Sequence, residues 1–113
     1  GVRKGKKVTF AAAIENITEA VEEGILVIDP KTQVMTQHIT IPIVDSPIVE
    51  FTHQPRIVAG KIHAAMKGVN IQDGNERLKA LIKVSTGESN NVLVRLDSND
   101  YNLAADIIVF FLT

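Results

Sequence analysis

Ile107-Ile108-Val109-Phe110-Phe111-Leu112 is the stretch of sequence that decides the expected fold. These side chains are all apolar and do not alternate with polar residues, so neither face of the segment should contact water in the folded protein. Residues branched at Cβ and aromatic residues pack well on a pleated surface, which favours a strand over a helix. An exposed strand of this kind would promote aggregation. We therefore predict that residues 107–112 form a central strand of a sheet or a strand within a subunit interface.

The preference for β-branched residues extends over the whole chain. Isoleucine and valine account for 27 of the 113 residues, and leucine for only seven. A chain of this length is expected to form one domain with one modest core. The composition predicts an α+β fold with a mainly antiparallel β-sheet of five to seven strands and two helices packed on one face. The edges of such a sheet need cover, which predicts a homo-oligomer, either a dimer or a larger symmetric assembly.

Periodicity and turn signals place the individual elements. A first helix is predicted over residues 11–23, where apolar side chains recur at helical spacing. A second helix is predicted to open at Pro55 and to end at Gly68. Asp73-Gly74 is typical of a two-residue hairpin turn. The predicted strands, which are separated by turn residues, cover residues 25–28, 33–44, 48–53, 69–72, 77–84, 92–96 and 107–112.

The apolar faces of these elements define the expected core. One stripe of each helix and one face of each strand should point inward. The core residues predicted on this basis are Ile14, Ile17, Val21, Leu26, Ile28, Ile39, Ile41, Phe51, Ile57, Ile62, Met66, Ile82, Val84, Val94, Ile108 and Phe110.

Charge is distributed unevenly along the chain, although the formal net charge is only −1. Residues 1–7 are predicted to form a flexible basic arm, followed by a single α+β domain over residues 8–113. Glutamates then crowd the carboxyl end of the first predicted helix, where the helix dipole favours cations. The positive side chains of the arm are Arg3, Lys4, Lys6 and Lys7.

The arm could simply be solvated, and two further roles are open to it. It could contact the phosphates of a nucleic acid, but the domain is not basic and lacks interleaved aromatic residues, so a nucleic-acid partner is disfavoured. Alternatively, it could contact the glutamates of the first helix, within one subunit or between subunits. In that case deletion of residues 1–7 should weaken folding or association at low salt, and unchanged behaviour would reject the contact.

The residue inventory excludes several classes of site. There is no cysteine, so disulfides and thiolate metal sites are ruled out, and the chain suits a reducing, cytoplasmic compartment. The longest apolar run, residues 107–112, is far shorter than the roughly 20 residues that span a bilayer, so no membrane insertion is expected. Neither a glycine-rich phosphate loop nor a nucleophile elbow occurs. We predict no catalytic residue, no metal and no cofactor.

The three histidines give the remaining candidates. Glu50 and His53 have the Glu-x-x-His spacing of some helical metal sites, but their setting predicts a strand, on which they would point to opposite faces. His38 and His63 fall on polar faces, so solvated histidines are expected. A ligand pocket, if one forms, is expected to gather Glu50, His53 and Tyr101.

These observations favour a non-enzymatic, self-associating structural or interaction protein. The first alternative is a small enzyme or ligand-binding module with its pocket at a subunit interface, as in ferredoxin-like dimers. The second is a nucleic-acid-binding accessory protein that uses the basic arm.

Overall fold

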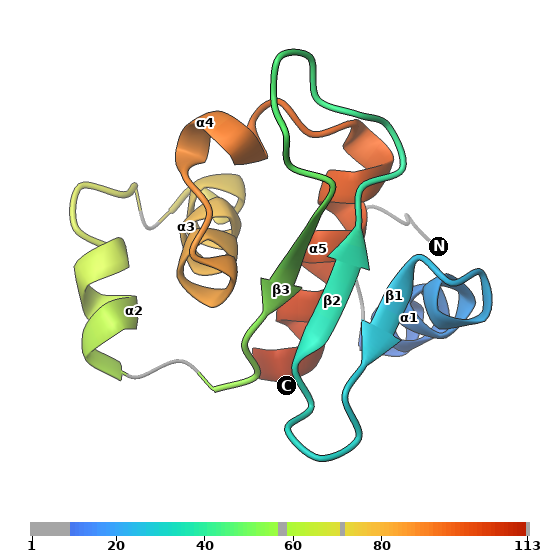
Figure 1. Cartoon of the computed structure of the whole chain (residues 1–113). Helices are drawn as coiled ribbons and strands as arrows, with labels where there is room; N and C mark the ends of the chain where they lie inside the picture. The colour runs from blue at the N-terminus through green and yellow to red at the C-terminus, as the bar shows by residue number, and fades with distance from the viewer. Residues whose placement is uncertain (1–9, 57–58, 71, 113) are drawn as a thin grey trace, which may run out of the picture.

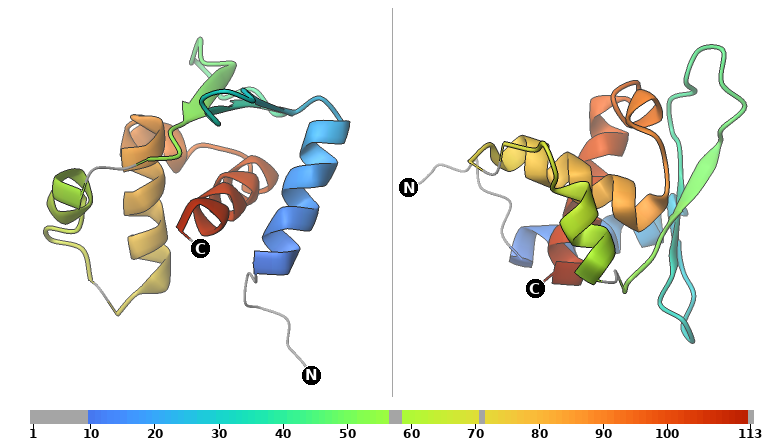
Figure 2. Two further views of the ribbon diagram at one scale, coloured as in Figure 1. Left: turned by 90° about the horizontal axis from the view of Figure 1, so that it is seen from below. Right: turned by 90° about the vertical axis from the view of Figure 1, so that its left-hand side faces the viewer.

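A computed structural model describes residues 10–56, 59–70 and 72–112. Its elements, in chain order, are α1 (Phe10–Glu22), β1 (Leu26–Ile28), β2 (Met35–His38), β3 (Glu50–His53), α2 (Ala59–Ala65), α3 (Gly74–Thr86), α4 (Asn90–Leu93) and α5 (Ser98–Leu112). The strands form one antiparallel sheet in the order β1-β2-β3. The helices lie on one face of this sheet, and no described helix covers the other face (Figure 1, Figure 2). The fold is α+β, but the prediction of five to seven strands with two helices is wrong.

The first half of the chain follows the sequence prediction closely. The first helix is confirmed as α1, and Gly24 ends it with a left-handed φ of 78°. The following strand and turn are confirmed as well, because Asp29 accepts hydrogen bonds from the backbone of Lys31 and Thr32 (2.8 and 3.3 Å). These bonds stabilise the carboxylate and lower the pKa of Asp29. β2, however, ends at His38, and the predicted strand beyond it is a loop.

The central correction concerns the carboxyl-terminal run, which forms the last two turns of α5 rather than a strand. α5 begins after Asp97, whose carboxylate accepts a hydrogen bond from the backbone of Asn99 (3.0 Å). The helix then passes between α1 and α3 beneath the sheet (Figure 2). A helix that is covered on several sides needs no polar face, so an unbroken apolar run fits it as well as it fits a buried strand.

A second correction concerns Asp73-Gly74, which starts a helix instead of turning a hairpin. The Asp73 carboxylate accepts hydrogen bonds from the backbone of Asn75 and Glu76 (3.0 and 3.3 Å), and therefore caps α3. Gly87 ends this helix with a φ of 74°. The predicted strand over residues 77–84 is thus helical. The strand predicted over 92–96 is also wrong, since Ser89 caps α4 there.

The remaining element predictions are corrected in part. The second predicted helix is shorter, because α2 covers only Ala59–Ala65. Residues 57–58 and 71 lie outside the described residues, and the described positions from Val69 to Gln72 form no strand. None of the described helices combines the length and the apolar character needed to cross a membrane.

The core consists of two apolar clusters that meet at α5. The large cluster lies toward α3 and contains Ile43, Phe51, Ile82, Leu93, Leu96, Ala104, Ala105 and Ile108. The small cluster lies toward α1 and contains Ile17, Ala20, Leu26, Met35 and Ile107. Successive residues of α5, Ile107 and Ile108, therefore bury their side chains in different clusters.

The predicted core is right in only some positions. Ile17, Leu26, Phe51, Ile82 and Ile108 are buried as expected. Another four predicted core residues are only partly buried, namely Ile39, Ile62, Met66 and Val84, and Ile57 lies outside the described residues. The predicted core residues that are exposed are Ile14, Val21, Ile28, Ile41, Val94 and Phe110.

Candidate functional site

The three residues expected to line a pocket do not come together. Glu50 lies on the uncovered face of the sheet, where its Oε1 pairs with Nδ1 of His38 at 3.4 Å. His53 points to the opposite face and is fully buried, so the prediction that it is solvated is wrong. Tyr101 packs from α5 against the large cluster. The predicted opposition of Glu50 and His53 is confirmed, but their gathering with Tyr101 is not.

His53 belongs to a buried polar line that joins the sheet to α5. The Gln37 side-chain amide donates to the backbone carbonyl of Asp100 (2.8 Å), so its oxygen faces Nε2 of His53, which donates to it at 2.8 Å. Nδ1 of His53 is then an acceptor, and it has no hydrogen-bond partner among the described residues. Burial lowers the pKa of His53 to about 4, so the ring is neutral at physiological pH.

Asp100 extends this line to the loop after β2. Its carboxylate accepts hydrogen bonds from the hydroxyl of Thr40 (2.8 Å) and from the backbone of Thr40 and Ile41 (3.0 and 3.3 Å). Arg95 also donates to the carbonyl of Val44 in this loop. Apart from Nδ1 of His53, the buried side-chain polar atoms of the described residues all have hydrogen-bond partners, so we interpret this line as structural rather than as a ligand site.

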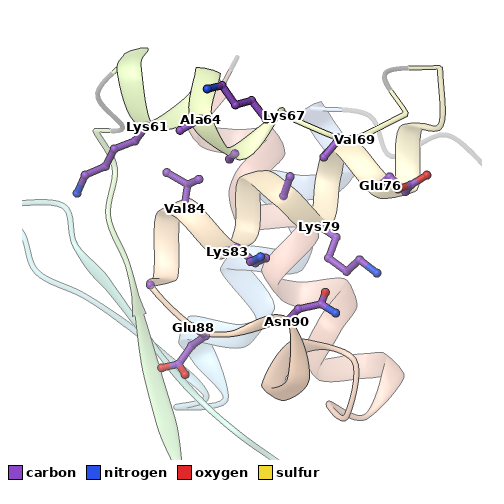
Figure 3. A pocket seen from close by; sticks show the side chains of 14 residues that line it. Lys61, Ala64, Lys67, Val69, Glu76, Lys79, Lys83, Val84, Glu88 and Asn90 are labelled. Atoms are coloured by element: carbon purple, nitrogen blue, oxygen red, sulfur yellow. The ribbon is translucent and has the colours of Figure 1, made fainter.

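A concave site forms instead between α2 and α3, which pack side by side at the edge of the molecule (Figure 3). The hollow has a volume of about 770 Å³, which lies within the range of small-ligand pockets, roughly 300–1,000 Å³. We call it the lysine groove, because four lysines line it: Lys61, Lys67, Lys79 and Lys83.

Local helix geometry sets the pattern of its walls. Lys79 and Lys83 are four residues apart on α3, so they project from the same side of the helix. Ala80 and Val84 form the next row, and together with Ala65 of α2 they give the groove a small, aliphatic lining. Lys61 and Lys67 rise from the α2 side (Figure 3).

The charge of the groove is positive but not uniform. None of its four lysines forms an ion pair with a carboxylate of the described residues. Two glutamates also line it, Glu76 in the first turn of α3 and Glu88 beyond its carboxyl end, so the positive stretch lies between them. A cleft lined mainly by one sign of charge concentrates the opposite charge, and this one favours an anionic ligand.

The lysine groove could not be recognised in the sequence. Lys79 and Lys83 were assigned to the polar face of a strand, and the groove exists only because α2 packs against α3. The predicted contact residues of the arm, Arg3, Lys4, Lys6 and Lys7, lie outside the described residues. Within the described parts of the chain, no cluster of three or more histidine, aspartate or glutamate side chains could hold a metal ion.

Comparison with protein-family models, with curated proteins and with solved structures finds no match for this chain. The lysine groove is therefore interpreted from its own geometry and charge.

Proposed function

We propose that this protein is a non-enzymatic interaction protein that binds an acidic protein segment in the lysine groove. The observation that carries the proposal is the combination, in one hollow, of a small aliphatic lining with four lysines that form no ion pair within the described residues. Lysines gathered in one hollow repel one another, and an acidic partner would relieve that repulsion. The proposal includes a cytoplasmic location, because the absence of cysteine agrees with a reducing compartment. It also includes self-association of the chain.

The lining favours protein over nucleic acid as the partner. Proteins that hold single strands stack the bases on aromatic side chains, and this groove has none among its lining residues. A helix or loop with glutamates beside small apolar side chains matches both the lysines and the aliphatic lining.

Binding of a short oligoglutamate peptide tests the proposal. At low salt the protein should bind the labelled peptide in fluorescence anisotropy, and Lys61→Glu with Lys83→Glu should weaken binding by at least about tenfold. Both lysines are exposed, so the fold should persist. Lys31→Glu, in the turn between β1 and β2, is the matched control and should leave binding nearly unchanged.

Two results would overturn the proposal. One is peptide binding that is absent at low salt or unaffected by the two groove substitutions. The other is a DNA duplex that binds through the same lysines more tightly than the peptide, which would favour the nucleic-acid alternative.

A further inference from the structure

The end of the molecule opposite the lysine groove is acidic. α1 contains no lysine or arginine, and its outward face carries Glu15, Glu19 and Glu22, which are all exposed. We call these three residues the acidic ridge. α1 and α2 lie at opposite sides of the molecule in two views (Figure 1, Figure 2). One molecule therefore presents a negative helix on one side and a positive hollow on the other.

The apolar side chains of α1 that stay partly exposed border the core rather than the acidic ridge. Phe10, Ile14 and Val21 are exposed to 42%, 38% and 42%. Helical spacing places them beside the buried stripe of α1, and the ring of Phe10 stacks on Phe110 of α5 with 6.0 Å between the centroids. The acidic ridge is therefore the outward surface that α1 offers to a partner.

We infer that the acidic segment held by the lysine groove is α1 of a second copy of this chain. This inference rests on the proposed function and names the partner of that same site. The acidic ridge would meet the four lysines that line the groove. Glu15 and Glu19 are about 6 Å apart along their helix, and so are Lys79 and Lys83 along theirs, because each pair is separated by four residues.

The described residues show no ion pair for the glutamates of α1. Glu19 and Glu22 lie in the second half of the helix, where the dipole disfavours carboxylates, and α1 has no basic residue in its last turn. Neutral or basic side chains at these two positions would make α1 more stable in the isolated molecule. Contact with lysines of a neighbouring copy would turn this unfavourable arrangement into a favourable one.

The contact has a definite symmetry. It joins two different surfaces, so it is heterologous, and the pair of copies still has one free groove and one free ridge. Association is therefore head to tail and produces longer chains or a closed ring. Because it depends on charge, it should be strong at about 10 mM salt and lost at about 1 M, where the Debye length falls to roughly 3 Å.

Variants that disrupt either the lysine groove or the acidic ridge test the inference in sedimentation velocity experiments. The wild-type chain should associate at low salt. A groove variant, Lys61→Glu with Lys83→Glu, and a ridge variant, Glu15→Lys with Glu22→Lys, should each stay monomeric, with association weakened at least about tenfold. An equimolar mixture of the neutral variants, Lys61→Gln with Lys83→Gln and Glu15→Gln with Glu22→Gln, should form a dimer and stop there, because only one intact groove and one intact ridge can meet. Glu50→Lys, on the uncovered sheet face, is the control and should associate like wild type.

The outcomes distinguish failure of this inference from failure of the proposed function. A wild-type chain that stays monomeric at low salt, or a groove variant that associates normally, overturns the inference. If oligoglutamate still binds the groove in that case, the proposed function stands and the partner is another acidic protein. Should a reversal variant fail to fold, the neutral pair Lys61→Gln with Lys83→Gln tests the groove, and Glu15→Gln with Glu22→Gln tests the ridge. Each neutral pair should weaken association less than the matching reversal does.

Discussion

The acidic end of the molecule at α1 and the basic end at α3 pack on opposite sides of the same helix, α5, and α2 packs against α3. In α3 the charges agree with the helix dipole, with Glu76 in the first turn and Lys83 in the last. In α1 they oppose it, since glutamates gather toward the carboxyl end. The charges of α3 therefore contribute to folding, whereas those of α1 are better explained by contact with a partner.

The largest expected effect comes from weakening the packing of α1 or α3 on α5. Ile107→Ala leaves a cavity on the α1 side, and Ile108→Ala leaves one on the α3 side. Each should lower the free energy of unfolding by roughly 2–5 kcal/mol, because both side chains are fully buried. Urea denaturation measures this. If Ile107→Ala hardly changed the free energy of unfolding, α1 would not be fixed on α5, and the acidic end would have no defined position.

The next effect lies between the ends, on the inner face of the sheet. Burial lowers the folded-state pKa of His53 from 6.5 to about 4. Below pH 6.5 the unfolded chain binds a proton at His53 that the folded chain does not bind. The free energy of unfolding is therefore unaffected by this group above pH 6.5 and falls as the pH approaches 4. The loss due to His53 amounts to about 3 kcal/mol.

His53→Gln should flatten this pH dependence, since the replacement does not titrate. Unfolding by urea between pH 7 and pH 4.5 would compare wild type with this variant and with His63→Gln, whose exposed ring makes it the control. A wild-type and a His53→Gln curve of equal slope would contradict the buried, neutral ring.

A smaller effect concerns Asp106, which faces Asn16 across the contact between α5 and α1 at 3.0 Å. Burial raises its pKa, and the hydrogen bond from Asn16 opposes that rise. The carboxylate therefore costs stability once the pH has passed its folded pKa. Asp106→Asn should increase stability at pH 7 by up to about 1 kcal/mol, a value that allows for solvent screening. Thermal unfolding should show this gain shrinking toward pH 3, and a gain that grows on acidification would refute the assignment.

The smallest effects compare the two helix ends directly. At low salt, Glu22→Gln should raise the free energy of unfolding and Lys83→Gln should lower it, each by about 0.3–1 kcal/mol. Opposite signs, measured by denaturation of the monomer at low protein concentration, would support the contrast between α1 and α3. Equal signs would remove it.

Local chemistry explains how far the sequence could predict this fold. Gly24 and Asp29 act within their own neighbourhood, so the helix, turn and strand around them were predicted correctly. Asp73 was misassigned because an aspartate before a glycine suits either a hairpin or a helix cap, and only the following residues decide. The run 107–112 was misassigned because it has no polar residue to reveal a period: Ile107 and Ile108 are fully buried, and the exposed Phe110 and Leu112 are apolar as well.

The candidate site depended on the same distinction. Once residues 77–84 are helical rather than extended, Ala80 and Val84 join Lys79 and Lys83 on the side that faces α2. Alternation on a strand also correctly separated Glu50 from His53, but it could not show that only one of them would be buried. Burial depends on which helices cover the sheet, and no single segment encodes that.

Site-specific cross-linking tests the central claim most directly, because the chain has no cysteine of its own. Thr18→Cys places a thiol beside the acidic ridge, and Ala64→Cys places one in the lysine groove, with every charge retained. Oxidation of an equimolar mixture at low salt should join one variant to the other faster than either joins itself, and faster than Thr18→Cys joins a Thr52→Cys control. Cross-linking at equal rates in all combinations would contradict a groove that holds the first helix of a second copy.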